Sequence, residues 1–242
     1  MLKNNFDTIA AISTCPGEGG IGIVRVSGKN ALKIADKIFI SKDKIKPSQA
    51  KSHTLHYGVV SCGGALVDEA ILTLMRAPKS YTKEDVVEIN CHGGMVILRK
   101  VLELVLRNGC RLAEPGEFTK RAFLNGRLDL TQAEAVIDMI RAKTDSALNI
   151  SLGQLRGGLS AEFNALRRSI LKELLFLEAS IDFPEENIRP AKLHQQGKGL
   201  KRIITVLDKL LKESSSGRIL REGMAVVICG CPNVGKSSLL NA

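Results

Sequence analysis

Apolar residues at helical spacing dominate the middle of the chain and constrain its fold more than any other feature. From Leu148 to Ile181 they follow one another three or four residues apart. This spacing lines one face of an α-helix with apolar side chains, and Pro184 ends the pattern because proline disrupts a helix interior. We therefore expect one long helix whose apolar face packs in the core of a helical bundle.

The sequence on both sides of this stripe also predicts helices, so that residues 119–221 form an all-α region. Thr131-Gln132-Ala133-Glu134 has the capping-box pattern that opens a helix. A later helix carries apolar residues at similar spacing from Leu200 to Leu211. The run Ser214-Ser215-Ser216-Gly217 interrupts this pattern as a linker would.

Residues 1–118 have a different texture, in which short apolar runs alternate with turns. Ala31–Phe39 and Met95–Arg107 have helical patterns, and Asn108-Gly109 ends the second. This mixture predicts an α+β domain. The expected strands are Ile9–Ile12, Ile21–Val26, Leu55–Val60, Ile71–Met75 and Val86–Ile89.

Residues 222–242 carry the motif that points most directly to chemistry. Met224–Cys229 is a continuous apolar run, which is typical of a buried parallel strand. Residues 230–237 then match G-x-x-x-x-G-K-[ST], a glycine-rich loop whose backbone N–H groups cradle phosphates. In such a loop Lys236 bridges the β- and γ-phosphates and Ser237 ligates magnesium. We expect a strand, a nucleotide-binding loop and a helix that begins at Lys236, and a plain strand–turn–helix connection is the less favoured alternative.

Phosphoryl transfer needs groups that this loop does not supply. The sequence provides no later strand with a magnesium-binding aspartate, no element that reads the base and no residue that positions water. We therefore expect this chain to bind phosphate weakly at most and not to hydrolyse nucleotide alone. The catalytic residues are expected beyond residue 242, and the choice between guanine and adenine stays open.

A second glycine pattern, at Gly17, Gly19 and Gly22, fits the dinucleotide fingerprint G-x-G-x-x-G. That fingerprint requires a helix directly after it. The residues that follow, up to Val26, are instead β-branched and strand-like. We therefore reject a dinucleotide site and expect a tight turn between two strands.

Charge and hydropathy limit the class of protein. The chain has 35 Lys and Arg against 25 Asp and Glu, a net charge of +10 that is spread along the sequence. This excess permits a polyanionic partner such as RNA, and a merely basic soluble protein fits the charge as well. No apolar run approaches the ~20 residues of a membrane helix. With no signal-peptide core at its start, the chain is expected to be cytoplasmic, without a membrane partner.

Several long stretches, in the same order along the chain, resemble the MnmE (TrmE) family of tRNA-modification GTPases. Lys83 departs from the pattern, because the family usually has glycine there, and this turn is expected to differ. The matching stretches are 7–28, 80–82 with 84–94, 115–130, 181–186 and 232–241.

The resemblance implies an organisation and an activity. Residues 1–118 correspond to an α+β domain that dimerises and binds a folate one-carbon donor, 5-formyl- or 5,10-methylene-tetrahydrofolate. Residues 119–221 correspond to an all-α helical domain, and residues 222–242 to the truncated start of an α/β P-loop GTPase domain. GTP hydrolysis in the family depends on K⁺ and Mg²⁺. It is coupled to a carboxymethylaminomethyl-type modification of C5 of the wobble uridine in tRNA, in a heterotetramer of the homodimer with an MnmG-type FAD protein.

Residue roles are also implied by the resemblance. Arg25, Glu88 and Arg127 match positions that contact the folate, and Asn233 matches a K⁺ ligand. Ser237 matches the Mg²⁺ ligand. The stretch that corresponds to the nucleotide-binding loop is Asn233, Val234, Gly235, Lys236, Ser237 and Ser238.

Two other functions remain open at this point. One is a non-catalytic, dimeric scaffold that binds folate and tRNA. The other is a folate-dependent one-carbon transfer enzyme whose glycine-rich loop is incidental.

Overall fold

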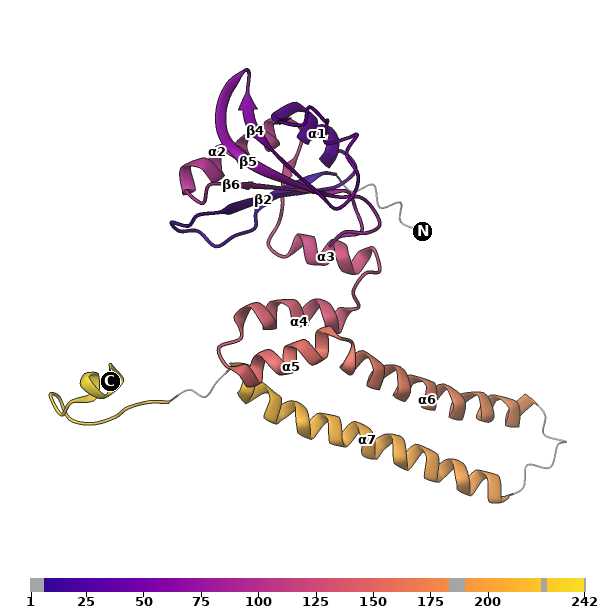
Figure 1. The fold of residues 1–242 in the computed structure, drawn as a ribbon. Helices are drawn as coiled ribbons and strands as arrows, with labels where there is room; N and C mark the ends of the chain where they lie inside the picture. The colour runs from indigo at the N-terminus through magenta and orange to yellow at the C-terminus, as the bar shows by residue number, and fades with distance from the viewer. Residues whose placement is uncertain (1–6, 183–189, 223–225, 242) are drawn as a thin grey trace. The chain divides into compact units, whose positions relative to one another are not determined.

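A computed structural model describes residues 7–182, 190–222 and 226–241 (Figure 1). The chain divides into two compact units, residues 1–133 and 134–242. The α+β fold expected for the first part and the helical fold expected for the second are both confirmed. The domain bounds after residues 118 and 221 stay predictions.

The first unit is built on a mixed sheet that has, in the described residues, the strand order β3-β4-β5-β6-β2-β1-β7. Neighbouring strands are antiparallel except β1 and β7, which are parallel. All five predicted strands are present, and the short β3 and β7 were not predicted. The strands are β1 (Ile9–Ile12), β2 (Gly22–Ser27), β3 (Phe39–Ser41), β4 (Thr54–Cys62), β5 (Ala65–Met75), β6 (Val86–Cys91) and β7 (Arg111–Leu112).

Two helices supply the other half of the core of this unit. Helices α1 (Ala31–Ile38) and α2 (Met95–Arg107) lie where the apolar spacing predicted them. Their apolar faces join alternate side chains of the strands in one cluster, because successive residues of a strand point to opposite faces. The strand residues between them are left on the other face of the sheet. Central members of the cluster are Val24, Leu72, Ile89, Leu98 and Val101.

The segment after the glycines at 17, 19 and 22 is a strand, as expected. Gly22 itself is the first residue of β2, and a Cβ atom there would meet the side chain of Leu98 on α2. Glycine is needed at this point for close packing of the sheet against the helix.

Helices make up most of the second unit. The single long helix expected from Leu148 to Ile181 is wrong, because Gly157 separates two helices with a φ of +87°. Glycine reaches this left-handed conformation without steric cost and therefore ends helices. Pro184 lies outside the described residues. The helices are α4 (Leu130–Arg141), which begins in the first unit, α5 (Asp145–Leu155), α6 (Gly158–Asp182), α7 (Pro190–Glu222) and α8 (Lys236–Leu240).

The apolar stripe is not buried along its length. Leu166 is 8% exposed, whereas Leu174 is 46% and Ile181 76% exposed. Helices α5, α6 and α7 contact one another, and Figure 1 shows α6 beside α7. Their contacts leave many side chains of the stripe partly exposed among the described residues, so the expectation that the stripe faces a core along its length is wrong.

Two local predictions in this region need correction. Residues 214–217 continue helix α7 to Glu222 and are not a linker, because serine and glycine lower helix stability without forbidding a helix. The helix expected after residue 130 is present, but its capping box lies two residues earlier. The backbone N–H of Gln132 donates to the Asp129 carboxylate, and the Asp129 N–H donates to the Gln132 side chain.

The described part of the segment before the glycine-rich loop is not a strand, and Met224 and Ala225 of the expected strand lie outside the described residues. Val226–Cys229 lacks regular secondary structure, and Val226 and Val227 are 74% and 80% exposed. A buried parallel strand needs neighbouring strands to pair with, and the described residues of this unit supply none. The helix expected at Lys236 is present as α8. No helix in the described ranges is long and apolar enough to cross a membrane.

Candidate functional site

Two of the predicted site residues face each other on adjacent strands of the sheet. Arg25 of β2 is in register with Glu88 of β6. The Nε and Nη2 atoms of Arg25 both lie 2.7 Å from Oε1 of Glu88. Because Val24 and Ile89 point into the core, this pair lies on the opposite face, with the two side chains 27% and 18% exposed. In the described part of the chain Oε2 of Glu88 accepts no hydrogen bond, so it can accept from a ligand.

Aromatic rings bring the third predicted residue to the same place. The guanidinium carbon of Arg25 is 5.6 Å from the ring centroids of both Tyr81 and Phe118. The guanidinium carbon of Arg127 lies 4.7 Å from the Tyr81 centroid. These distances are those of cation–π contacts. The structure therefore gathers Arg25, Glu88 and Arg127 around one tyrosine.

A shallow, open pocket of about 440 Å³ adjoins this cluster. Arg25 and Glu88 are not among its lining residues, and the Tyr81 ring, which contacts both arginines, connects the pocket to them. The pocket is lined by His53, Met75, Pro78, Lys79, Ser80, Tyr81, Lys83 and Arg127.

Lys83 adopts a φ of +57°, in the left-handed region that favours glycine. The glycine that the resemblance implies at this turn would adopt this conformation without steric cost. The Nζ atom of Lys83 donates to the carbonyl oxygen of Gly126 at 2.9 Å. The lysine therefore contacts the segment that carries Arg127, and whether this turn differs from that of the family stays a prediction.

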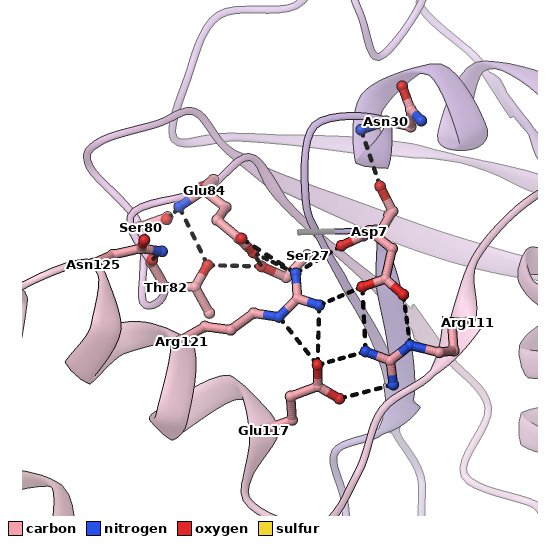
Figure 2. Close-up of polar contacts among 11 residues, drawn as sticks. Asp7, Ser27, Asn30, Ser80, Thr82, Glu84, Arg111, Glu117, Arg121 and Asn125 are labelled. Carbon is pink, nitrogen blue, oxygen red and sulfur yellow. Dashed lines mark hydrogen bonds and ion pairs between the residues drawn. The ribbon is translucent and has the colours of Figure 1, made fainter. Parts of the chain in front are cut away.

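Beside the cluster lies a network of charges around the buried Arg121 (Figure 2). Arg121 of helix α3 (Glu117–Leu124) has a side chain that is 1% exposed. Its guanidinium lies between three carboxylates: Nη2 is 2.8 Å from Asp7 and 3.0 Å from Glu117, and Nη1 is 3.2 Å from Glu84. Arg111 contacts Asp7 and Glu117 from the other side, at 2.6 and 2.7 Å. Every charge in this network thus faces an opposite charge, as buried charges require.

The network shifts the protonation of its carboxyl groups. Burial alone would raise the pKa of Glu117, but hydrogen bonds from Arg111, the backbone N–H of Glu114 and Arg121 lower the pKa to about 2. A hydrogen bond from Arg111 lowers the pKa of Asp7, against an opposing effect of burial, and Arg121 adds to the lowering. Both groups are therefore carboxylates near neutral pH.

Sequence reasoning missed Tyr81, Phe118 and Arg121. All three lie inside the stretches that carry the family resemblance. These stretches also contain Arg127 and Glu88, and this closeness in sequence is the one signal that could have pointed to them. No local pattern marks them, because their role depends on partners from other strands and helices.

The glycine-rich loop and the first turn of α8 hold the predicted nucleotide-binding residues together. The loop curls so that Nζ of Lys236 donates to the carbonyl oxygen of Cys231 at 2.6 Å. Asn233 and Gly235 both have left-handed backbone, with φ of +58° and +89°. The roles of Asn233 and Ser237 toward K⁺ and Mg²⁺, and of Val234 and Ser238 toward nucleotide, stay predictions.

Two family models match the chain. Residues 8–127 match the model described as the GTP-binding protein TrmE N-terminus. Residues 130–228 match that of the MnmE helical domain. Together they cover most of both units, including Arg25, Glu88 and Arg127. The matches end before the loop at residues 230–237.

Curated relatives match over nearly the whole chain. The tRNA modification GTPase MnmE of Carboxydothermus hydrogenoformans is 57% identical over 238 residues, which is 98% of this chain and 52% of the relative. The protein of the same name from Geobacillus kaustophilus is 56% identical over 243 residues, with the same coverage. This chain thus spans about half the length of the curated relatives that it matches. The chain therefore belongs to the MnmE (TrmE) family.

Proposed function

We propose that this chain is the N-terminal and helical part of a tRNA-modification GTPase, and that its first unit binds a tetrahydrofolate one-carbon donor. The names of the relatives support the first statement. One observation carries the second: Arg25 and Arg127 both contact the Tyr81 ring while Arg25 pairs with Glu88. We take 5-formyl- or 5,10-methylene-tetrahydrofolate as the ligand.

The chemistry of these side chains fits a folate. The amino-pyrimidine edge of a pterin is a pair of hydrogen-bond donors that suits the Glu88 carboxylate, as in other charge-assisted pairs. Tyr81 and Phe118 offer apolar faces to a flat ring. Because Arg25 pairs with Glu88, Arg127 is the guanidinium that suits the anionic glutamate tail.

We further propose that the loop at 230–237 contributes to GTP binding in a protein with a complete GTPase domain. Lys236 would neutralise phosphate charge, Ser237 would hold Mg²⁺ and Asn233 would hold K⁺. GTP hydrolysis would be coupled to modification of the tRNA wobble uridine, together with an FAD protein of the MnmG type and as a homodimer.

Titration calorimetry with 5-formyltetrahydrofolate tests the folate site. Arg25→Ala and Glu88→Gln each remove a charge-assisted contact, so we expect affinity about tenfold or more weaker in each. Arg99→Ala is the matched control, because Arg99 is an exposed arginine on α2 whose ion pair with Glu103 is at 3.8 Å. Undiminished binding in both site variants would remove this assignment.

Potassium dependence tests the loop. In a protein extended through a complete GTPase domain, we expect GTP hydrolysis to be faster in potassium than in sodium, and Asn233→Ala to abolish the difference. Equal rates in the two salts before any substitution would contradict the proposed role of Asn233.

A further inference from the structure

The wall of the folate site that carries Tyr81, Phe118 and Arg127 is not part of the sheet. Tyr81 belongs to the loop between β5 and β6, and Phe118 to helix α3. Arg25 and Glu88 lie on the strands themselves. The site therefore depends on how this wall is held against the sheet.

The loop and α3 are joined to each other by contacts near the site. The hydroxyl of Tyr81 lies 2.8 Å from the Thr119 hydroxyl. The side-chain amide of Asn125 donates to the carbonyl oxygen of Thr82 at 2.7 Å. With the contact from Lys83 to Gly126, these hydrogen bonds make the loop and α3 one piece.

Glu84 and Arg121 join this piece to the sheet (Figure 2), beside the contact of Ser27 with Thr82 and the ion pair of Arg111 on β7 with Glu117 on α3. Oε2 of Glu84 accepts from the Ser27 hydroxyl of β2 at 2.6 Å. The Glu84 carboxylate also receives Nη1 of Arg121 at 3.2 and 3.3 Å. Arg121 donates further to the carbonyl oxygen of Asp7, two residues before β1, at 2.7 Å. One buried guanidinium thus contacts the loop, its own helix and the chain that leads into β1.

We propose that Arg121 is a positioning residue for the folate site, which acts through Glu84 and α3 to set Tyr81 and Arg127 against Arg25 and Glu88. Folate binding at this site rests on the proposed function. The placement of Tyr81 by Arg121 rests on the contacts of Arg121 and Glu84 and is independent of the ligand. A guanidinium suits this role, because its planar fork fixes the direction of several hydrogen bonds at once and an ammonium group does not.

Fluorine NMR of protein labelled with 3-fluorotyrosine separates positioning from general stability. The chain has two tyrosines, and Tyr57 lies on β4, where its hydroxyl donates to Glu69. A Tyr57→Phe variant assigns the two signals. In Arg121→Lys and in Glu84→Gln we expect the Tyr81 signal to shift or broaden while the Tyr57 signal stays in place. We also expect binding of 5-formyltetrahydrofolate about tenfold weaker, because small displacements in a binding site are costly.

Arg99→Lys is the matched control. Arg99 is an exposed arginine on α2 whose ion pair with Glu103 is at 3.8 Å, and it has no hydrogen bond or ion pair with the loop or α3 in the described residues. Its variant should keep both the Tyr81 signal and the folate affinity.

An unchanged Tyr81 signal in folded Arg121→Lys and Glu84→Gln proteins would overturn the proposal. If Arg121→Lys does not fold, Glu84→Gln decides alone. If the unsubstituted protein binds no folate, the proposed function fails, and the Tyr81 signal still decides whether Arg121 positions the wall.

Discussion

The two units of this chain differ in how completely they bury the apolar side chains of their regular patterns. In the first, Leu72 and Ile89 are fully buried and Leu98 is 1% exposed. In the second, Leu174, Leu175 and others of α6 are 40% exposed or more. The first unit pairs strands that are distant in sequence and covers them with helices, whereas the helices of the second contact one another over part of their length. Regular apolar spacing thus specifies an element without specifying what covers it.

The largest effect expected from this contrast comes from truncating matched leucines. Leu72→Ala should lower the free energy of unfolding of the first unit by about 2–5 kcal/mol, because it leaves a cavity in a closed core. Leu174→Ala should change the free energy of unfolding by less than about 1 kcal/mol, because the side chain is already 46% exposed.

Denaturant unfolding measures both. The chain has no tryptophan, and both tyrosines lie in the first unit, so tyrosine fluorescence follows that unit. Helical circular dichroism follows mainly the second unit, which carries the longest helices. Equal losses in the two variants would mean that the stripe on α6 is as well covered as the sheet, and the contrast would be wrong.

The second effect depends on pH and should be confined to the first unit. Glu117 has a pKa of about 2 in the folded protein against an ordinary value of 4.5. A lowered pKa stabilises the folded state above the unfolded value, and this contribution is lost as the pH falls through the folded value. The difference corresponds to about 3 kcal/mol. Unfolding of the first unit should therefore need less denaturant as the pH falls from about 5 to about 2.

Glu117→Gln provides the control for this pH dependence. It removes the titrating group while keeping its size, so the variant should be less stable at neutral pH and its stability should fall less steeply toward low pH. A slope equal to that of the unsubstituted protein would show that other groups cause the acid sensitivity.

The smallest effect concerns how the helices begin. Helices α1 and α2 of the first unit start without a side-chain cap, whereas Thr144 caps α5 by accepting the N–H of Ala147 at 3.1 Å. Thr144→Ala should cost about 1 kcal/mol, and Thr144→Ser, which keeps the hydroxyl, much less. Helical circular dichroism during denaturation measures both. No difference between the two variants would mean that packing, as in the first unit, holds α5 in place.

The sequence predicted elements that depend on residues close together in the chain, and it did not predict contacts between residues far apart in it. Helix α2 and the central strands were predictable, because alternation and helical spacing are local patterns. The burial of Arg121 was not, since a charged residue can be buried only with partners, and one of these, Asp7, lies 114 residues away. The break at Gly157 depends on one residue inside a continuous apolar pattern, which periodicity cannot detect.

The glycine-rich loop also shows that local elements are predictable and that elements which need distant partners are not. Its motif predicted the helix at Lys236 correctly, and the apolar run before it predicted a strand that is not formed. A strand is defined by its neighbours, whereas the first turn of a helix closes its own hydrogen bonds. The cluster around Tyr81 lies between these cases: Arg25, Glu88 and Arg127 came from the family resemblance, while the contacts of the two arginines with Tyr81 required the fold.

The distance along the chain between Asp7 and its arginine partners affects how the protein is made. A nascent chain emerges from the ribosome at about 5–20 residues per second, so the partners of Asp7, 104 and 114 positions later, arrive on the order of ten seconds after it. During that interval β1 has no β7 beside it, and an unpaired strand edge is open to non-native pairing. Co-translational folding of the first unit is therefore completed only when β7 pairs with β1.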